Sequence, residues 1–135
     1  KSTENAYRDV NIAFANQVAK ICEISGGDVW KVRQFVNMSP GRNMLLPGGG
    51  VGGHCIPKDP WLLIAGLENQ TNTDLIRTAR FLNDGMPKHV TSLIEKALIE
   101  RNVQLKSASI SILGYSYLEG SDDTRNSPSK HWPNC

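Results

Sequence analysis

The sequence predicts a mainly α-helical protein that ends in the beginning of an α/β unit. Apolar residues recur at helical spacing in two long stretches, about 2–24 and 73–101. Only the segment SASISILGY, residues 107–115, alternates small polar with apolar residues as a strand does. A single strand is not stable unpaired. We therefore expect residues 1–102 to form a helical domain and residues 103–135 to begin a second, truncated domain.

The first predicted helix, residues 2–24, is stopped by a pair of glycines. Asp28 follows and can cap a second helix that ends near Met38, before Ser39-Pro40-Gly41. Aromatic residues at helical spacing predict a core made of large side chains, namely Phe14, Trp30, Phe35 and Trp61.

A loop of about twenty residues, 39–60, separates the second helix from the third. Loops this long are uncommon in compact domains and are usually functional. Pro60 suits the first turn of a third helix that continues to about Leu67. The long fourth helix should be kinked at Gly85-Met86-Pro87, because proline cannot donate a helical hydrogen bond.

Composition excludes several classes of protein. The 15 basic and 13 acidic residues are scattered and give a net charge of +2, so no basic stripe indicates nucleic-acid binding. No apolar run approaches the roughly 18 residues of a membrane span, so we expect no membrane partner. Three widely spaced cysteines indicate a reducing, cytoplasmic setting rather than a disulfide framework.

The segment GGGVGGHCIPKDP, residues 48–60, is the most distinctive part of the long loop. Its glycines satisfy the dinucleotide fingerprint G-x-G-x-x-G, but Pro47 and Pro57 oppose the strand and helix that this fingerprint requires. Lys58 lacks the flanking residues of a phosphate-binding P-loop. His54 and Cys55 could be two ligands of a metal ion, but the sequence has no second Cys or His pair at ligand spacing to complete four ligands. We therefore predict no metal site.

Two interpretations of Cys55 remain open from local chemistry. A cysteine in a rigid glycine-rich loop can be a nucleophile, because glycines let a substrate lie close to the backbone. Lys58 and Asp59 could then lower the thiol pKa and handle a proton on water. Equally, Cys55 could be a small buried residue that fills a turn.

Three motifs, in order, resemble those of the UDP-glucose/GDP-mannose dehydrogenase family. Residues 50–59 match G-x-G-G-x-C-[hydrophobic]-P-K-D, and the opening KSTENAYRDVNIA resembles the start of the family's helical middle domain. SILGYSYLEGSDDTRNSP resembles the signature that opens its nucleotide-sugar-binding domain, although Leu118 stands where the family commonly has lysine. The resemblance covers the chain to about Ser129.

The resemblance implies a helical dimerisation domain followed by the first strand of an α/β domain. The family's NAD-binding domain would lie outside this chain, and NAD would be the cofactor. We expect a homodimer formed through the long central helix, about Leu75 to Leu98. Residues 1–135 alone would then be inactive.

The resemblance also assigns roles in oxidising the sugar C6 alcohol to a carboxylate by two hydride transfers. Cys55 matches the nucleophile that forms a thiohemiacetal and then a thioester. Lys1 and Asn5 match the pair that stabilises charge on the C6 oxygen, and Asp59 matches the carboxylate that activates water. Further residues match contacts to NAD, at Lys58, and to substrate, at Gly50, Gly52, Gly53, Arg42 and Arg125.

The sequence GVGGHC, followed by Asp-Pro-Trp, resembles the loop of members that act on N-acetylated hexosamines. It favours a UDP-N-acetylhexosamine substrate such as UDP-N-acetylmannosamine. The alternatives are UDP-glucose or, for this chain alone, a non-catalytic helical dimerisation module.

Overall fold

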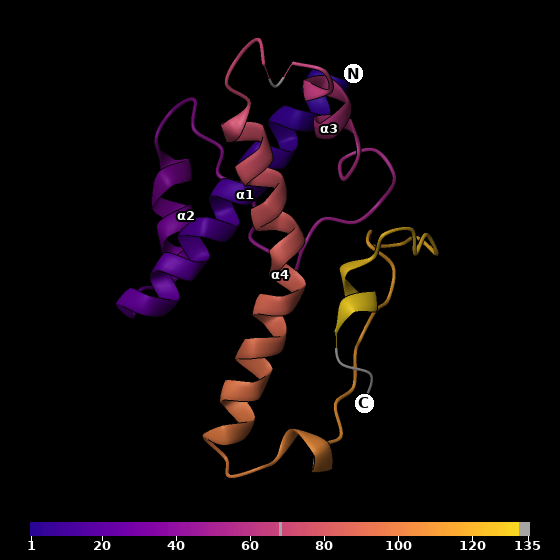
Figure 1. The fold of residues 1–135 in the computed structure, drawn as a ribbon. Helices are drawn as coiled ribbons and strands as arrows, with labels where there is room; N and C mark the ends of the chain where they lie inside the picture. Colours follow the sequence, from indigo (N-terminus) through magenta and orange to yellow (C-terminus); the bar gives the residue numbers. More distant parts are fainter. Residues whose placement is uncertain (68, 133–135) are drawn as a thin grey trace.

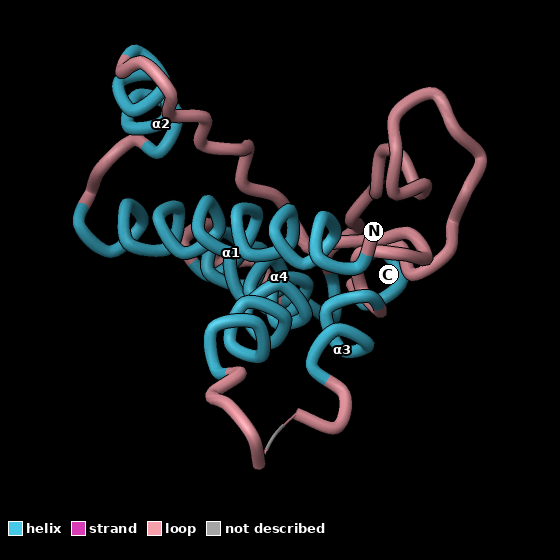
Figure 2. Tube along the Cα trace, turned by 90° about the horizontal axis from the view of Figure 1, so that it is seen from above, coloured by secondary structure: helices cyan, strands magenta, loops and turns pink. Residues whose placement is uncertain are grey.

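The computed structural model describes residues 1–67 and 69–132 (Figure 1). Its helices are α1 (Ser2–Ser25), α2 (Val29–Met38), α3 (Asp59–Ile64) and α4 (Asp74–Ile99), with short 3₁₀ turns η1 (Leu105–Ser107) and η2 (Pro128–His131). α1 lies across α4, and α2 stands to one side of α1 (Figures 1 and 2). The chain after α4 returns alongside it, so that η2 contacts α4.

The first two helices begin and end where the sequence predicts. Gly26 ends α1 in a left-handed conformation, with φ of 73°, and its N–H donates to the Cys22 carbonyl. Asp28 caps α2, because its side chain accepts hydrogen bonds from the N–H groups of Trp30 and Lys31. These boundaries confirm the prediction.

The third helix is shorter than predicted, whereas the fourth begins and ends within two residues of the predicted 73 and 101. α3 ends at Ile64, before the predicted Leu67, because Ala65 takes an extended ψ of 128°. α4 continues through Pro87 and ends at Ile99. Pro87 is buried in the middle of this helix and has no N–H for the carbonyl one turn earlier.

The contact between α1 and α4 is made of small side chains on the α1 face, and the prediction of an aromatic core was wrong for three of its four residues. Phe14, Trp30 and Phe35 are 58%, 59% and 67% exposed. The fourth, Trp61, is half-buried and meets the Phe81 ring edge-on, with ring centroids 5.4 Å apart. Alanines occupy the buried face of α1 and let it lie close to α4, which leaves no space there for aromatic rings. The buried apolar residues of α1 are Ala6, Ala13, Ala15, Ala19 and Cys22.

The mainly helical class is confirmed, but the predicted strand at residues 107–115 does not form. Residues 108–115 have no regular secondary structure, and no segment of 1–67 or 69–132 is a strand. The physical reason is that a strand needs a neighbour to satisfy its backbone groups, and the described residues supply none. No helix in this part of the chain is long and apolar enough to cross a membrane.

Candidate active site

The loop that carries Cys55 turns tightly into α3. The N–H groups of Lys58 and Asp59 both donate to the Cys55 carbonyl, at 3.1 and 2.8 Å. Asp59 begins α3, and its Oδ2 accepts a hydrogen bond of 2.6 Å from Asn5 Nδ2 on α1. The cysteine therefore precedes a short, backbone-bonded turn whose far end is fixed to the first helix.

A hollow of about 270 Å³ opens beside Cys55. Cys55 itself is exposed rather than buried, so it is not a filler of the turn. The hollow gathers residues from α1, the loop and the C-terminal segment, namely Lys1, Asn5, Gly52, Gly53, His54, Cys55, Ile56, Tyr117 and Arg125. Six of these are residues that the family resemblance selects: Lys1, Asn5, Gly52, Gly53, Cys55 and Arg125.

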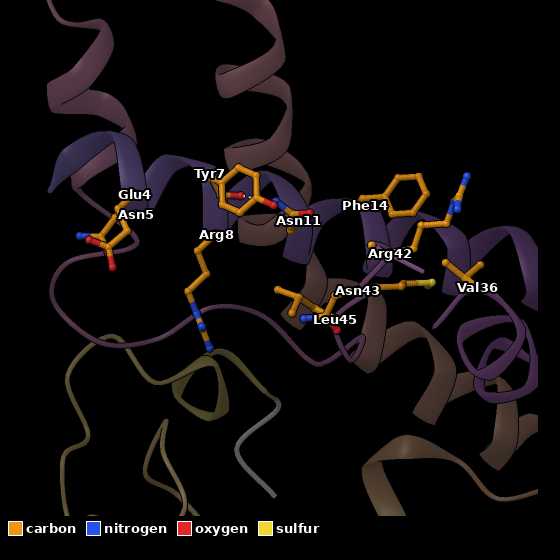
Figure 3. Close-up of a pocket in the computed structure, with 12 residues that line it drawn as sticks. Glu4, Asn5, Tyr7, Arg8, Asn11, Phe14, Val36, Arg42, Asn43 and Leu45 are labelled. Atoms are coloured by element: carbon orange, nitrogen blue, oxygen red, sulfur yellow. Dashed lines mark hydrogen bonds between the residues drawn. The ribbon is translucent and has the colours of Figure 1, made fainter. Parts of the chain in front are cut away.

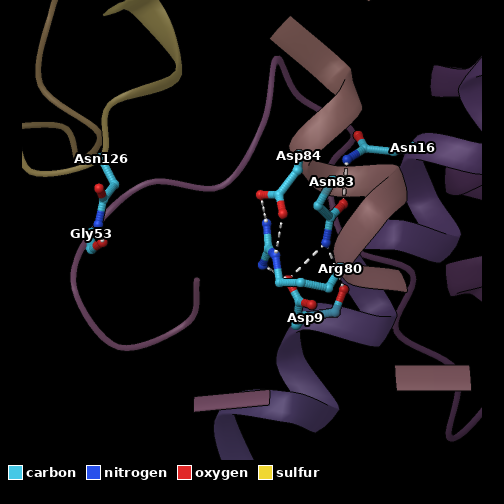
Figure 4. Close-up of polar contacts among 7 residues, drawn as sticks. All are labelled: Asp9, Asn16, Gly53, Arg80, Asn83, Asp84 and Asn126. Carbon is cyan, nitrogen blue, oxygen red and sulfur yellow. Dashed lines mark hydrogen bonds and ion pairs between the residues drawn. The ribbon is translucent and has the colours of Figure 1, made fainter. Parts of the chain in front are cut away.

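The glycines of the loop make room for the protein's own C-terminal segment. A Cβ on Gly52 would lie 2.3 Å from Tyr117 Cβ, and one on Gly50 would lie 3.1 Å from the Pro128 ring. Gly53 has φ of +86°, its N–H donates to the Arg125 carbonyl at 2.8 Å, and its carbonyl accepts from Asn126 Nδ2 at 2.9 Å (Figure 4). The glycines were predicted to let a substrate lie close to the loop backbone. In the structure, residues 117–128 of the same chain lie close to it instead.

Arg125 reaches the hollow while paired with Asp123. Its Nη2 lies 2.6 Å from Asp123 Oδ2, and Nε bonds both oxygens of that carboxylate. Hydrogen bonds from Arg125 lower the pKa of Asp123 to about 2, and the same contact raises the pKa of Arg125. Both groups are therefore charged at neutral pH, and Arg125 presents a cation to the hollow.

The remaining sequence-selected residues do not line the Cys55 hollow, although Lys58 and Asp59 belong to the turn at Cys55. Arg42 lines a separate hollow of about 620 Å³ between α1 and residues 41–45 (Figure 3), and its Nη1 donates to the Pro40 carbonyl at 3.4 Å. Gly50 lies under Pro128, outside the Cys55 hollow. Lys58 is exposed beside it, with Nζ 3.3 Å from His54 Nε2.

Sequence reasoning gave no site role to Tyr117 or His54, although both line the hollow. Tyr117 occupies the aromatic position of the third motif, which was a usable signal. His54 was considered only as a metal ligand, which was rejected, and as part of the loop sequence that indicates the substrate. Its contact with Lys58 follows from their spacing of four residues around the turn.

A buried polar cluster lies between α1 and α4 (Figure 4). Arg80 is fully buried and forms ion pairs with Asp9 and, at 2.8 Å, with Asp84. Asn83 Nδ2 donates to the carboxylate and the carbonyl of Asp9, at 2.8 and 3.0 Å. Burial raises the pKa of Asp9, while the charge of Arg80 and the bond from Asn83 oppose that rise. No spacing pattern in the sequence singled out this cluster.

In the described ranges, no three His, Cys, Asp or Glu side chains gather in a way that could hold a metal ion. Cys135, which the sequence places four residues after His131, lies outside the described residues.

Several known proteins are similar to this chain. The UDP-N-acetyl-D-mannosamine dehydrogenase of Methanococcus vannielii is 45% identical over 130 residues, covering 96% of this chain and 29% of the relative. The protein of the same name from Salmonella typhi is 42% identical over 132 residues, covering 95% and 31%. The solved structure of a UDP-D-ManNAc dehydrogenase from Pyrococcus horikoshii matches with a TM-score of 0.90 and 42% identity, over 96% of this chain and 31% of that one.

The model of the UDP-glucose/GDP-mannose dehydrogenase family, central domain, matches residues 1–85. The chain belongs to this family, and such membership implies a nicotinamide cofactor. It spans about three tenths of the length of the relatives, 29% and 31% for the two named above.

Proposed function

We propose that these residues form the central part of an NAD-dependent nucleotide-sugar 6-dehydrogenase. The observation that carries the proposal is the meeting of Cys55, Lys1 and Asn5 around one hollow. A thiol, an ammonium and an amide donor are the groups that thioester chemistry at a sugar aldehyde requires. Lys1 and Asn5 are one helical turn apart, so they can serve the same oxygen.

The proposed reaction oxidises a primary alcohol at sugar C6 in two stages. Bound NAD would supply the acceptor for one hydride in each stage, and the exposed Lys58 ammonium would suit a contact with its phosphates. In the first stage the hydroxyl proton of the alcohol passes to a base. After the first stage, the Cys55 thiolate adds to the aldehyde carbon, and Lys1 and Asn5 stabilise the C6 oxygen. After the second, the carbon is a Cys55 thioester. Water attacks this carbon, its proton passes to a base, and Cys55 leaves as the thiolate.

Asp59 is the proposed group that orients or deprotonates this water. Its carboxylate is held by Asn5 at 2.6 Å, which fixes it beside the cysteine turn. Arg125 is proposed to bind an anionic or carbonyl part of the substrate, since it is charged and lines the same hollow. Gly52 and Gly53 are proposed to shape this wall, and Gly50, outside the hollow, to leave room for the Pro128 ring. Arg42 lies in the other hollow, so it is proposed to act toward a second subunit.

The proposed substrate is a UDP-N-acetylhexosamine, with UDP-glucose as the alternative. The similar proteins from Methanococcus vannielii and Salmonella typhi are named for UDP-N-acetyl-D-mannosamine. Because these substrates and NAD are cytoplasmic metabolites, we place the protein in the cytoplasm. The domain division at residues 102 and 103 belongs to the same proposal.

The test measures NADH formed per sugar by a complete dehydrogenase chain that includes residues 1–135. We expect two NADH from each limiting UDP-N-acetylmannosamine, and loss of the second in Cys55→Ser. Cys22→Ala is the matched control, because Cys22 is buried in α1 and should leave the yield unchanged. Two NADH in Cys55→Ser would contradict the thioester route, and activity on UDP-glucose alone would select the alternative substrate.

We further propose that the protein is a homodimer. Exposed apolar side chains recur every seven residues on α1, at Tyr7, Phe14 and Ile21, and continue onto α2 at Trp30 and Phe35. Monomeric proteins rarely expose so large an apolar face.

The dimer face is tested by sedimentation of two variants. Phe14→Ser should raise the dimer dissociation constant at least about tenfold if α1 carries the contact. Leu75→Ser tests the long helix α4, which the sequence favoured and where Leu75 is also exposed. An unchanged dissociation constant in both variants would reject both faces.

A further inference from the structure

Two asparagines of α1 hold the two ends of the segment that carries Cys55. Asn16 Oδ1 accepts a hydrogen bond of 2.8 Å from the Gly48 N–H. Asn5 Nδ2 donates to Asp59 Oδ2 at 2.6 Å. Residues 48–59 are therefore fixed to one helix at their beginning and at their end, and Cys55 lies between the two contacts.

The Asn16 side chain is held in one orientation by its neighbours on α4. It is fully buried, and its Nδ2 donates to Asn83 Oδ1 at 2.9 Å (Figure 4). Asn83 cannot turn its amide around, because its own Nδ2 already donates to the carboxylate and carbonyl of Asp9. Because its Nδ2 is turned toward Asn83, Asn16 presents its oxygen to Gly48, and the Gly48 N–H needs an acceptor.

We propose that Asn16 is a positioning residue for the Cys55 site, with Asn83 fixing the direction of its amide. This role rests on the proposed function. Between the two anchors, the loop is held by Gly53 to the Arg125 carbonyl and by the turn at Cys55. Without the hydrogen bond to Gly48, the beginning of the segment 48–59 is no longer fixed to α1. The Cys55 thiol can then move relative to Lys1 and Asn5. A displacement of about 1 Å at a reacting group can cost on the order of a hundredfold in rate.

Asn37 on α2 provides a matched control. Its Oδ1 accepts from the Met44 N–H at 2.6 Å, and its Nδ2 donates to the Met44 carbonyl at 3.2 Å. The same side chain thus makes the same kind of backbone contact within the same long loop, before Gly48 rather than at it. Asn37→Ala removes an anchor of the loop without removing the one next to the cysteine segment.

The first test is hydrogen exchange of the complete polypeptide, followed by mass spectrometry on peptides covering residues 51–60 and 40–46. In Asn16→Ala we expect exchange in 51–60 to become at least about tenfold faster, because the amides of Gly53, Lys58 and Asp59 lie there. Asn37→Ala should speed exchange in 40–46 alone. Unchanged exchange of 51–60 in Asn16→Ala would overturn the proposal.

A second pair of variants keeps the test decisive if Asn16→Ala does not fold. Gly48→Pro puts a ring carbon where the N–H faces Asn16 Oδ1, so it breaks the contact from the loop side without changing a residue of α1, whereas Gly48→Ala keeps the N–H. A Cβ at Gly48 meets no atom within 4 Å, so neither variant clashes through that atom. Faster exchange of 51–60 in Gly48→Pro but not in Gly48→Ala supports the anchor. Equal exchange in the two overturns it.

The second test is kinetic and separates this inference from the function on which it rests. In the complete dehydrogenase, Asn16→Ala should lower kcat by roughly tenfold or more with KM for the sugar nearly unchanged, while Asn37→Ala retains kcat. A rise in KM alone would refute a positioning role. If the unsubstituted enzyme does not reduce NAD at all, the proposed function fails, and hydrogen exchange still decides whether Asn16 orders the loop.

Discussion

Two interfaces of this protein are built in opposite ways. Between α1 and α4, polar side chains are buried, and Asp9 Oδ1 accepts from both Arg80 and Asn83 away from water. Asp9 Oδ2 is buried without a hydrogen-bond partner among the described residues. Between the glycine loop and residues 117–128, the fit depends on side chains that are missing, since Gly50 and Gly52 leave room for Pro128 and Tyr117. The contact between α1 and α4 is therefore fixed by paired polar groups. The contact between the glycine loop and residues 117–128 is fixed by the space that the glycines leave.

The difference shows how each interface can fail. A buried charge that loses its partner keeps the full cost of desolvation, so the whole helical domain is affected. A glycine that gains a methyl group displaces only what touches it, so the damage stays near the hollow. The three predictions below separate these two kinds of failure.

The largest effect is expected from Asp9→Asn, which leaves the buried Arg80 without its partner on α1. We expect a loss of about 3–5 kcal/mol in the free energy of unfolding, measured by urea denaturation. Asp84→Asn is the matched control, because it removes the other carboxylate of the same arginine at a side chain that is 55% exposed. Its loss should stay below about 1 kcal/mol. Equal losses would mean that burial does not distinguish the two pairs.

A smaller and local effect is expected from Gly52→Ala. The new Cβ would lie 2.3 Å from Tyr117 Cβ and 3.1 Å from the Asn126 carbonyl oxygen, so residues 117–126 must move. Limited proteolysis should then cut this segment faster while helical content is retained.

Gly85→Ala is the control for this substitution, because a Cβ there meets nothing within 4 Å and lies inside α4. It should stabilise the protein by up to about 1 kcal/mol. Unchanged cleavage in Gly52→Ala would contradict the packing of Tyr117 on the loop.

The smallest effect is expected from acid. The pKa of Asp123 is lowered to about 2 from its ordinary 3.8, so its pairing with Arg125 stabilises the fold fully above pH 3.8 and is lost as pH falls through about 2. Docking of residues 117–128 should be constant from about pH 5 to 8. An NMR titration of the Asp123 carboxyl group measures this pKa. The Asp122→Asn variant is the control, because it removes the exposed carboxyl group of the neighbouring residue. A midpoint near 3.8 would disprove the pairing.

Local sequence signals predicted the helices because caps and stops act within a few residues. Asp28 and Gly26 fixed their helix ends as expected. The residues of the core could not be predicted from the sequence. The spacing of apolar residues indicates which side of a helix is apolar, but it does not indicate which other element packs against that side. Phe14, Trp30 and Phe35 lie on the exposed face, whereas alanines and polar residues lie within.

The candidate site was predictable only through its motifs. Composition and spacing could not decide between a nucleophile and a filler at Cys55, and only the fold brings Lys1 and Arg125 to the same hollow. Asn16 and Asn83 gave no signal, since an asparagine in a helix is ordinarily expected to face solvent. Their role depends on a contact between residues 67 positions apart.

The two anchors on α1 also set how much chain is available between them. Asn5 and Asn16 are as many residues apart as Gly48 and Asp59, and the loop runs antiparallel to the helix. A helix advances about 1.5 Å per residue, whereas an extended chain can cover about 3.3 Å. The loop thus has roughly twice the contour length that its anchors require. The extra length of chain must bend away from the helix. This bend places Cys55 at an exposed position, although both ends of the loop are fixed to a helix with a buried face.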